Sequence, residues 1–507
     1  LGAISAVGTA GALGLCAAAL LLAAACALPG RARVGFGAAG SVLALVPFIA
    51  PVPDPAATSV VGALYSPTEY RPDDVVTLLA RDGRTASVLV RDRDGRLEYW
   101  VEGSFESSTG PTDRLHLGLL GHLPMVLFSA RADRPARVAL VGLGGGLTAA
   151  AVAGYAPARL DVYELEPAVA DAAELFRAAG GGLPARAVLH VADGRRGILD
   201  EPLDVISADP VHPSVAGSAY LYAVEWWRAA AARLAPEGVL VQWLPLYQMH
   251  VDEVRLVLRT FVTSVPYAYV FLAGGDAFLV ATRSPLRLDA GRLEHVLASE
   301  AAAPLRADGL GTPGRLLGLL ALDPEGCRAV AGPGELNTDD RLLLELRCGW
   351  REGNDPAAAY ALLTSRPADA RALLDAPGGA AFEAGLSRAQ DLRAALATWV
   401  AWDARRAFRR FRDLADGDPE DRFSARMRDE ASIEAARLWL AAGRDDEAAS
   451  IARETAARPD VEAILRLDAA EILVRTGAVD EAKAIAAPYA AAHPWPRARR
   501  LAAGRVR

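Results

Sequence analysis

Three acidic residues each stand directly after a short apolar run of the kind that forms a buried parallel strand. These acids and the runs before them are Glu164 after 160–163, Asp193 after 188–192, and Asp209 after 203–208. The carboxyl ends of parallel strands meet at one edge of a sheet, and open α/β sheets bind ligands at that edge. Carboxylates gathered there accept hydrogen bonds from hydroxyl groups and attract cations. The pattern therefore predicts a site for a small ligand that carries such groups.

A glycine-rich turn lies between a fourth apolar run and an alanine-rich helical stretch. It reads Gly142-Leu143-Gly144-Gly145-Gly146 and follows the run 137–141. Glycines in such a turn let the backbone approach a ligand closely, and an acid at the end of the next strand characteristically binds ribose hydroxyls. The Asp-Gly pair after the third strand suits an adenine contact, whereas the glycine spacing departs from the dinucleotide pattern Gly-x-Gly-x-x-Gly. We therefore predict a nucleoside site made of Gly142, Gly144, Gly145, Glu164, Asp193 and Gly194.

Several short motifs around these residues occur together in one known family. They are Val-Gly-Leu-Gly-Gly-Gly at 141–146, Tyr-Glu-Leu-Glu-Pro at 163–167, Ala-Asp-Gly-Arg at 192–195, and Leu-Tyr at 221–222 followed by Glu-Trp-Trp at 225–227. As a set they resemble the spermidine synthase group of aminopropyltransferases, and the segments 241–248 and 336–340 resemble its membrane-fused bacterial branch. The resemblance covers roughly residues 62–348. It implies a Rossmann-like, S-adenosylmethionine-type α/β fold after a small β-sheet, in a protein that forms homodimers.

Asp209 is the residue to which the resemblance assigns the chemistry. It aligns with the first aspartate of the family's Asp-x-x-Asp-Pro signature. Aminopropyl transfer is the attack of a neutral amine on the methylene group beside a sulfonium centre, and a carboxylate can take the proton that the amine must lose. The resemblance implies a catalytic Asp209, no metal, and a small amine such as putrescine as acceptor. The co-substrate is then decarboxylated S-adenosylmethionine or S-adenosylmethionine.

The sequence departs from the family pattern at three places. His212 replaces the second aspartate of the signature, Gly145 stands where family members carry an acid that faces the aminopropyl amine, and the family's tyrosine is absent near His116. We predict that His116, His212 and Tyr222 contact the substrate. His116 can bind an amine or act as a base near neutral pH. The competing interpretation of His116 is a partly buried histidine bonded to backbone.

Two other functions stay open at this point. An S-adenosylmethionine-dependent methyltransferase uses the same sheet, glycine turn and ribose-binding acid, and it tolerates the lack of an acid at Gly145. A non-catalytic module that binds a nucleoside or a partner is the second alternative, because a fold of this kind does not by itself imply catalysis. Failure to bind either form of the co-substrate would favour that module.

Two folding units must position these residues. Short strands are predicted at 75–80, 86–91 and 96–102, and the Asp94-Gly95 pair predicts a tight turn between the last two. These strands predict a small β-domain over 62–133, followed by the Rossmann-like domain over 134–348.

The first 52 residues differ in composition from the rest. No charged side chain occurs before Arg31, and the apolar run 13–28 is long enough to cross ~30 Å of hydrocarbon. A second apolar run follows at 34–50, and no basic leader of a secretory signal precedes them. We predict two transmembrane helices over 1–52, the end of a larger membrane module, in a protein of the inner membrane. The catalytic domain is expected in the cytoplasm, where S-adenosylmethionine is found, although Arg31 and Arg33 favour the opposite topology.

From about residue 351 the sequence turns to alanine, arginine, aspartate and leucine with helical periodicity. Gly443 and Glu447 recur as Gly477 and Glu481, an offset of 34 residues that is typical of tetratricopeptide-like helix pairs. We predict a helical repeat over 351–507 that binds a protein partner. Deletion of 360–507 is expected to leave the catalytic domain folded, and helical hairpins without a ligand groove are the alternative.

Charge and cysteine content exclude other classes of function. The net charge of −8 offers no basic surface, so we expect no nucleic-acid partner and a better match to a cationic substrate. The four cysteines, Cys16, Cys26, Cys327 and Cys348, have no metal-ligand spacing. At 507 residues, more than one folding unit is expected.

Overall fold

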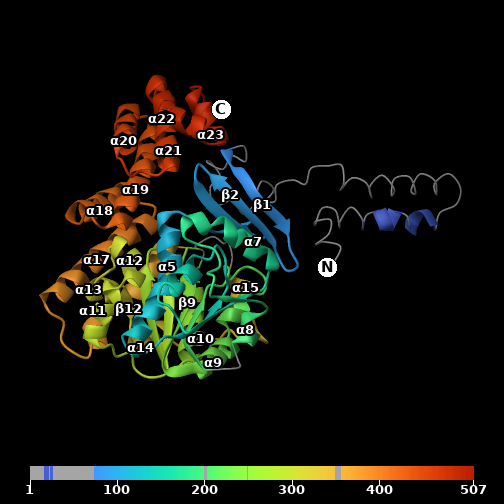
Figure 1. Ribbon diagram of the computed structural model, residues 1–507, viewed down its shortest axis with the longest axis vertical. Helices are drawn as coiled ribbons and strands as arrows, with labels where there is room; N and C mark the ends of the chain where they lie inside the picture. The colour runs from blue at the N-terminus through green and yellow to red at the C-terminus, as the bar shows by residue number, and fades with distance from the viewer. Residues whose placement is uncertain are drawn as a thin grey trace.

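The computed structural model describes residues 74–198, 202–247, 249–348 and 355–506, together with short pieces between 16 and 26. Within these residues the chain forms a small antiparallel sheet, a larger sheet with helices on both faces, and an array of C-terminal helices (Figure 1). The larger sheet and its helices form a Rossmann-like α/β region.

The predicted membrane segment is the part of the fold that the structure contradicts. A helix needs about 20 apolar residues to cross a bilayer, and no helix among the described residues is both long and apolar enough to do so. The two transmembrane helices predicted over 1–52 and the inner-membrane location are therefore contradicted by the described residues. Most of the range 1–52 lies outside the described residues.

The small sheet is a meander in which strands that follow each other in sequence are neighbours. Its strands are β1 (Val76–Asp82), β2 (Ser87–Arg93), β3 (Arg96–Val101) and β4 (Ser104–Ser108). The turn after β2 has positive φ at Asp94 and Gly95, and the turn after β3 has positive φ at Glu102 and Gly103. Such turns match the twist of a hairpin. β1 to β3 coincide with the three predicted strands, whereas β4 is absent from the prediction because its polar sequence gives no strand signal.

The larger sheet has eight strands in the order β12-β10-β11-β9-β8-β5-β6-β7. Its parallel strands are β5 (Arg137–Val141), β6 (Arg159–Glu164), β7 (Val188–Val191), β8 (Leu203–Ala208) and β9 (Leu234–Pro245). Its antiparallel strands are β10 (Tyr267–Ala273), β11 (Asp276–Thr282) and β12 (Leu320–Leu322). The chain runs from β5 outward to β7 and returns to the other side of β5 as β8. β5 and β8 therefore flank a topological switch point, where sheets of this kind bind ligands.

Helices cover both faces of the larger sheet. Leu140 of β5 belongs to one hydrophobic core and Val141 to another, because alternate side chains of a strand point to opposite faces. The first core includes α5 (Pro111–Ser129), and the second includes α9 (Val224–Arg233) and α10 (Val251–Ser264). Packing on both sides fixes the strand ends that carry the site.

Shorter helices connect these elements. They are α6 (Leu147–Ala153), α7 (Pro167–Leu175), α8 (Gly194–Gly197), the 3-10 helix η3 (Ser218–Tyr222), α11 (Ala290–Ala298), α12 (Ala303–Ala307), α13 (Pro313–Leu317), α14 (Pro324–Ala331), α15 (Leu343–Arg347) and α16 (Pro356–Thr364). The C-terminal helices are α17 (Ala380–Val400), α18 (Ala404–Gly417), α19 (Arg422–Ala441), α20 (Asp445–Ala457), α21 (Ala463–Arg475), α22 (Val479–Ala492) and α23 (Pro496–Ala502).

The C-terminal helices belong to two different hydrophobic cores. Phe382, Phe411 and Phe423, on α17, α18 and the start of α19, share the core of the larger sheet. The end of α19 and the helices α20 to α23 enclose a core of their own, which contains Leu473. The helices predicted for this region are present. The first part of the region nevertheless packs as one body with the α/β domain.

The last helices also contact the small sheet. Arg96 of β3 forms ion pairs with Glu430 and Glu462, and the indole of Trp495 donates a hydrogen bond of 3.0 Å to Asp92. Figure 1 shows α23 beside β2, although the two are far apart in sequence. The small sheet is thus supported by the C-terminal helices as well as by the α/β domain.

Candidate active site

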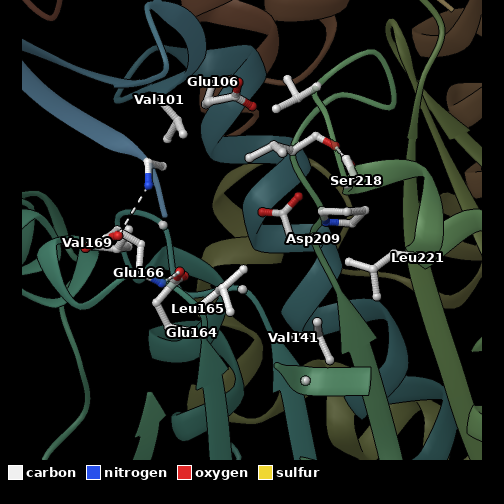
Figure 2. Close-up of a pocket in the computed structure, with 18 of the residues that line it drawn as sticks. Val101, Glu106, Val141, Glu164, Leu165, Glu166, Val169, Asp209, Ser218 and Leu221 are labelled. Atoms are coloured by element: carbon white, nitrogen blue, oxygen red, sulfur yellow. Dashed lines mark hydrogen bonds between the residues drawn. The ribbon is translucent and has the colours of Figure 1, made fainter. Parts of the chain in front are cut away.

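A cavity of about 950 Å³ lies where the small sheet faces the ends of the parallel strands. Figure 2 shows Glu164 and Glu166 on one side of it, Glu106 on another, and Asp209 near the middle. All but two of the predicted site residues line the cavity: His116, Gly142, Gly144, Gly145, Glu164, Asp193, Gly194 and Asp209. The topology therefore brings the strand-end acids and the glycine turn together.

His212 and Tyr222 lie outside the described lining of the cavity. The His212 ring is buried, its Nδ1 accepts a hydrogen bond from the Ser214 backbone (3.2 Å), and burial lowers its pKa to about 4. The phenol of Tyr222 is buried and donates a hydrogen bond of 2.9 Å to the carbonyl of Trp243. Both side chains are bound within the protein, and a neutral His212 has no charge with which to hold an ammonium group.

The glycine turn brings the ends of β5 and β8 close together. Gly142 has a φ of 97°, and a Cβ at this position would stand 2.8 Å from the backbone oxygen of Asp209, so the approach requires glycine. A Cβ at Gly145 would lie 3.1 Å from the ring of Phe176. A side chain at this position would require that ring to shift by a few tenths of an ångström.

Glu164 joins the end of β6 to the glycine turn. Its Oε2 accepts the backbone N–H of Leu143 (3.0 Å), and its Oε1 accepts that of Glu166 (2.9 Å). Burial raises the pKa of this carboxyl group, and the backbone hydrogen bonds oppose the rise. Each carboxylate oxygen has two lone pairs, so Glu164 can also accept hydrogen bonds from the hydroxyl groups of a ribose.

Glu166 caps α7 and also holds the turn between β1 and β2. Its carboxylate accepts the backbone N–H groups of Ala168 (3.0 Å) and Thr85 (2.7 Å). Burial raises the pKa of Glu166, but these hydrogen bonds outweigh burial and lower it overall. This acid therefore fastens the small sheet to the α/β domain beside the cavity.

Asp193 begins α8 at the end of the next strand. Its Oδ1 accepts the backbone N–H of Arg195 at 2.9 Å, and its side chain is exposed. The Arg195 guanidinium lies over the ring of Tyr220, 5.3 Å from its centroid, and pairs with Asp339 at 2.7 Å. Asp193 is thus positioned by its own helix and remains accessible from the cavity.

His116 and Asp209 form the charged centre of the cavity. The Nε2 of His116 lies 3.7 Å from Oδ1 of Asp209, beyond hydrogen-bond distance but within reach of strong electrostatic attraction. The His116 ring stacks on Trp243 at 5.2 Å, and the Trp243 indole donates a hydrogen bond of 2.7 Å to Asp276. Burial lowers the pKa of His116, but Asp276 and Asp209 together raise it to about 9. His116 is therefore a cation near neutral pH, not a free base.

Glu106 is a cavity residue that the sequence analysis misses. It lies on β4, and burial together with the charge of Asp209 raises its pKa to about 8. Its Oε1 is buried with no hydrogen-bond partner among the described residues. The sequence gives no local signal for it, because the segment 104–108 is polar and the Glu102-Gly103 pair is not one of the pairs that favour a two-residue hairpin turn.

The cavity holds more acidic than basic side chains. The acids are Glu102, Glu106, Glu164, Glu166, Asp193 and Asp209, and the basic residues are His116 and Arg195. This excess suits a ligand with positive charge. Among the residues that the structure describes, no group of histidine, cysteine, aspartate or glutamate side chains is arranged to hold a metal ion.

No protein-family model matches the sequence, and no curated protein matches it. Among solved structures, spermidine synthase from Thermotoga maritima is similar at 19% identity and a TM-score of 0.36, over 41% of this chain and 73% of that one. A probable spermidine synthase from Corynebacterium glutamicum is similar at 17% identity and a TM-score of 0.37, over 52% of this chain and 96% of its own. Human methyltransferase-like protein 13 in complex with SAH is similar at 21% identity and a TM-score of 0.29, over 37% of this chain and 88% of that one. The family that the sequence resembles is thus among the structural neighbours, and none of them bears on its membrane-fused branch.

Proposed function

We propose that this chain transfers an aminopropyl group from decarboxylated S-adenosylmethionine to a small aliphatic amine such as putrescine. The observation that carries the proposal is the position of Asp209, after β8, between the strand-end acids on one side and Glu106 on the other. Both reactants are cations, because one has a sulfonium centre and the other an ammonium group. A cavity rich in carboxyl groups attracts both.

The wall that holds the glycine turn supports binding of the adenosine part. Glu164 retains lone pairs for ribose hydroxyls, and the exposed Asp193 stands at the end of the neighbouring strand. The space beside Gly144 is open, with no atom within 4 Å of a Cβ built there, so a ligand can approach the backbone at the switch point. The resemblance to aminopropyltransferases assigns these same residues to the nucleoside.

The reaction needs one base and one leaving group. The acceptor ammonium first gives a proton to the Asp209 carboxylate. The lone pair of the resulting amine then attacks the methylene carbon beside sulfur; a carbon–nitrogen bond forms, and the carbon–sulfur bond breaks with its electron pair left on sulfur. The products are a thioether and a secondary ammonium ion, and the proton on Asp209 passes to solvent. The cationic His116, whose Nε2 lies 3.7 Å from Oδ1 of Asp209, places a positive charge beside this carboxylate.

An S-adenosylmethionine-dependent methyltransferase is the second candidate, and Gly145 favours it. Gly145 has no acidic side chain with which to hold an aminopropyl amine, and the ring of Phe176 lies beside this glycine. The intact co-substrate carries a carboxylate next to that amine, so a methyltransferase has less need of such an acid.

Mass spectrometry of reactions with putrescine and each form of the co-substrate distinguishes the two candidates. A gain of one aminopropyl unit from the decarboxylated form supports the proposal, whereas a gain of one methyl group from the intact form replaces it with the methyltransferase. Calorimetric titration with both forms precedes this experiment. Binding of neither form would favour the non-catalytic module.

A further inference from the structure

We infer that Glu106 and Asp209 together bind the reacting amino group of the acceptor, which is therefore a cationic aliphatic amine held between the small sheet and the larger one. The inference rests on the proposed function, because it names the side chains that select the acceptor of that reaction. Glu106, a residue outside the family signature, then binds the positively charged amino group.

Glu106 faces the same space as Asp209. Figure 2 shows both carboxyl groups turned into the cavity, one from β4 and the other from the end of β8. The neighbouring Ser104 side chain and His212 backbone lower the pKa of Glu106 and so oppose part of the effect of burial. Its Oε1 remains buried with no partner in the described part of the chain. Such an oxygen costs free energy unless a ligand supplies a donor.

The charges around Glu106 favour a bound cation. His116 already balances part of the charge of Asp209, so a second carboxylate is needed to neutralise an ammonium group. Burial and Asp209 raise the pKa of Glu106 to about 8, so its carboxyl group is largely protonated near neutral pH. An ammonium group between the two acids stabilises the ionised form and releases that proton. Tyr99, Tyr222 and His212 also lie near this space, and all three are neutral near pH 7. The further acids that interact with Asp209 or Tyr99 are Asp276, Glu164 and Glu166.

Glu106 supplies a negative charge that the loop after β8 lacks. His212 stands where the family signature has its second aspartate, and the buried His212 ring is neutral. The His212 backbone is one of the neighbours that lower the pKa of Glu106. An acid from the small sheet therefore lies beside the position where that aspartate is missing.

The variant Glu106→Gln tests the inference, because it keeps the size of the side chain and removes its charge. Putrescine is titrated calorimetrically into the full chain saturated with methylthioadenosine, the thioether product. We expect the affinity for putrescine to fall about tenfold to a hundredfold, while the affinity for methylthioadenosine changes less than about twofold. Heats measured in buffers of different ionisation enthalpy should show proton release in the parent chain and none in the variant.

A matched comparison is Glu174→Gln, which removes the same charge from an exposed position on α7, outside the described lining of the cavity. Its loss of putrescine affinity should be at least about fivefold smaller than that of Glu106→Gln. Equal losses in the two variants, or undiminished proton release in Glu106→Gln, would overturn the inference. If Glu106→Gln forms aminopropyl product at the rate of the parent chain, the role of Glu106 is wrong and the proposed function stands. If methylthioadenosine does not bind the parent chain, both the proposed function and the role of Glu106 are wrong.

Discussion

The guanidinium group of Arg497 donates a hydrogen bond of 3.0 Å to the carboxylate of Asp94, which lies 403 residues earlier in the sequence. Asp94 is in the turn between β2 and β3, Arg497 is on α23, and both are buried. Arg497 also pairs with Asp468 and Glu471 of α21. The small sheet, which forms one wall of the cavity, is therefore fixed to the C-terminal helices through buried charges.

Arg497→Ala should lower the free energy of unfolding by about 3–5 kcal/mol, because Asp94 loses its counter-charge while it stays buried and Asp468 keeps only the pair with Arg437. Urea unfolding followed by circular dichroism measures the change. Arg499→Ala, at an exposed position of the same helix, is the control and should change the free energy by less than about 0.5 kcal/mol. Small and equal changes in both variants would show that the buried pairs add no net stability.

His122 should make the protein less stable in acid. Burial lowers its pKa to about 4 from 6.5, so the folded state resists its protonation. Above pH 6.5 neutral His122 makes its full contribution to the free energy of unfolding. This contribution, about 3 kcal/mol, is lost as the pH falls toward 4. The free energy of unfolding between about pH 7 and pH 4.5 should therefore fall less steeply in His122→Gln. Replacement of the exposed His295 should leave the slope unchanged, and equal slopes in all three chains would contradict the assignment.

Glu164→Ala should weaken nucleoside binding about tenfold to a hundredfold, since one charge-assisted hydrogen bond contributes roughly 1.5–3 kcal/mol. The same change removes the acceptors of the Leu143 and Glu166 N–H groups, which loosens the glycine turn. Calorimetry with S-adenosylmethionine gives the dissociation constant. Glu174→Ala, an exposed acid on α7, serves as the control. An unchanged constant in a folded Glu164 variant would remove this residue from the site.

Asp209→Asn should lower turnover by ~10² or more, because the amide keeps the shape of the side chain but cannot take the proton of the acceptor. The affinity for the nucleoside should change less than about twofold, because the adenosine contacts lie on other strands. Steady-state kinetics with putrescine and the decarboxylated co-substrate measure both quantities. Turnover close to that of the parent chain would mean that another group is the base.

Two C-terminal deletions should behave differently. Deletion of 360–507 removes Phe382, Phe411 and Phe423 from the core of the larger sheet, so we now expect that chain to lose its fold. Deletion of 443–507 removes mainly the separate core of the last helices and exposes Asp94 to water. We expect this shorter deletion to stay folded and to bind nucleoside. Thermal unfolding of both chains checks the expectation, and a cooperative transition in the longer deletion would restore the boundary predicted near 351.

The strand-end acids and the glycine turn could be predicted from the sequence because their signals are local. Glu164, Asp193 and Asp209 each follow an apolar run, and parallel strands end at the same edge of a sheet. Gly142 carries its own signal, since a turn that brings two strand ends together needs a residue with positive φ.

The rest of the site depends on contacts between distant segments. β4 exists because it pairs with β3, so its polar residues gave no warning of Glu106. The charge of His116 is set by Asp276, which β11 brings beside it. The burial of His212 likewise follows from packing around the loop after β8 and not from its neighbours in sequence. The apolar composition of 1–52 is, in contrast, a strong local signal that led to a wrong prediction. It predicted membrane helices, but no described helix is long and apolar enough to cross a membrane.

The contact between α23 and the turn after β2 can form only after α23 has been synthesised. Asp94 leaves the ribosome 403 residues before Arg497 does. At translation rates of about 5–20 residues per second, this interval is roughly 20–80 s. Throughout it the small sheet has no counter-charge for Asp94, so the wall that carries Glu106 receives its last support only when almost all of this chain has been made. Newly made chains should therefore gain the full support of this cavity wall only after α23 has been made.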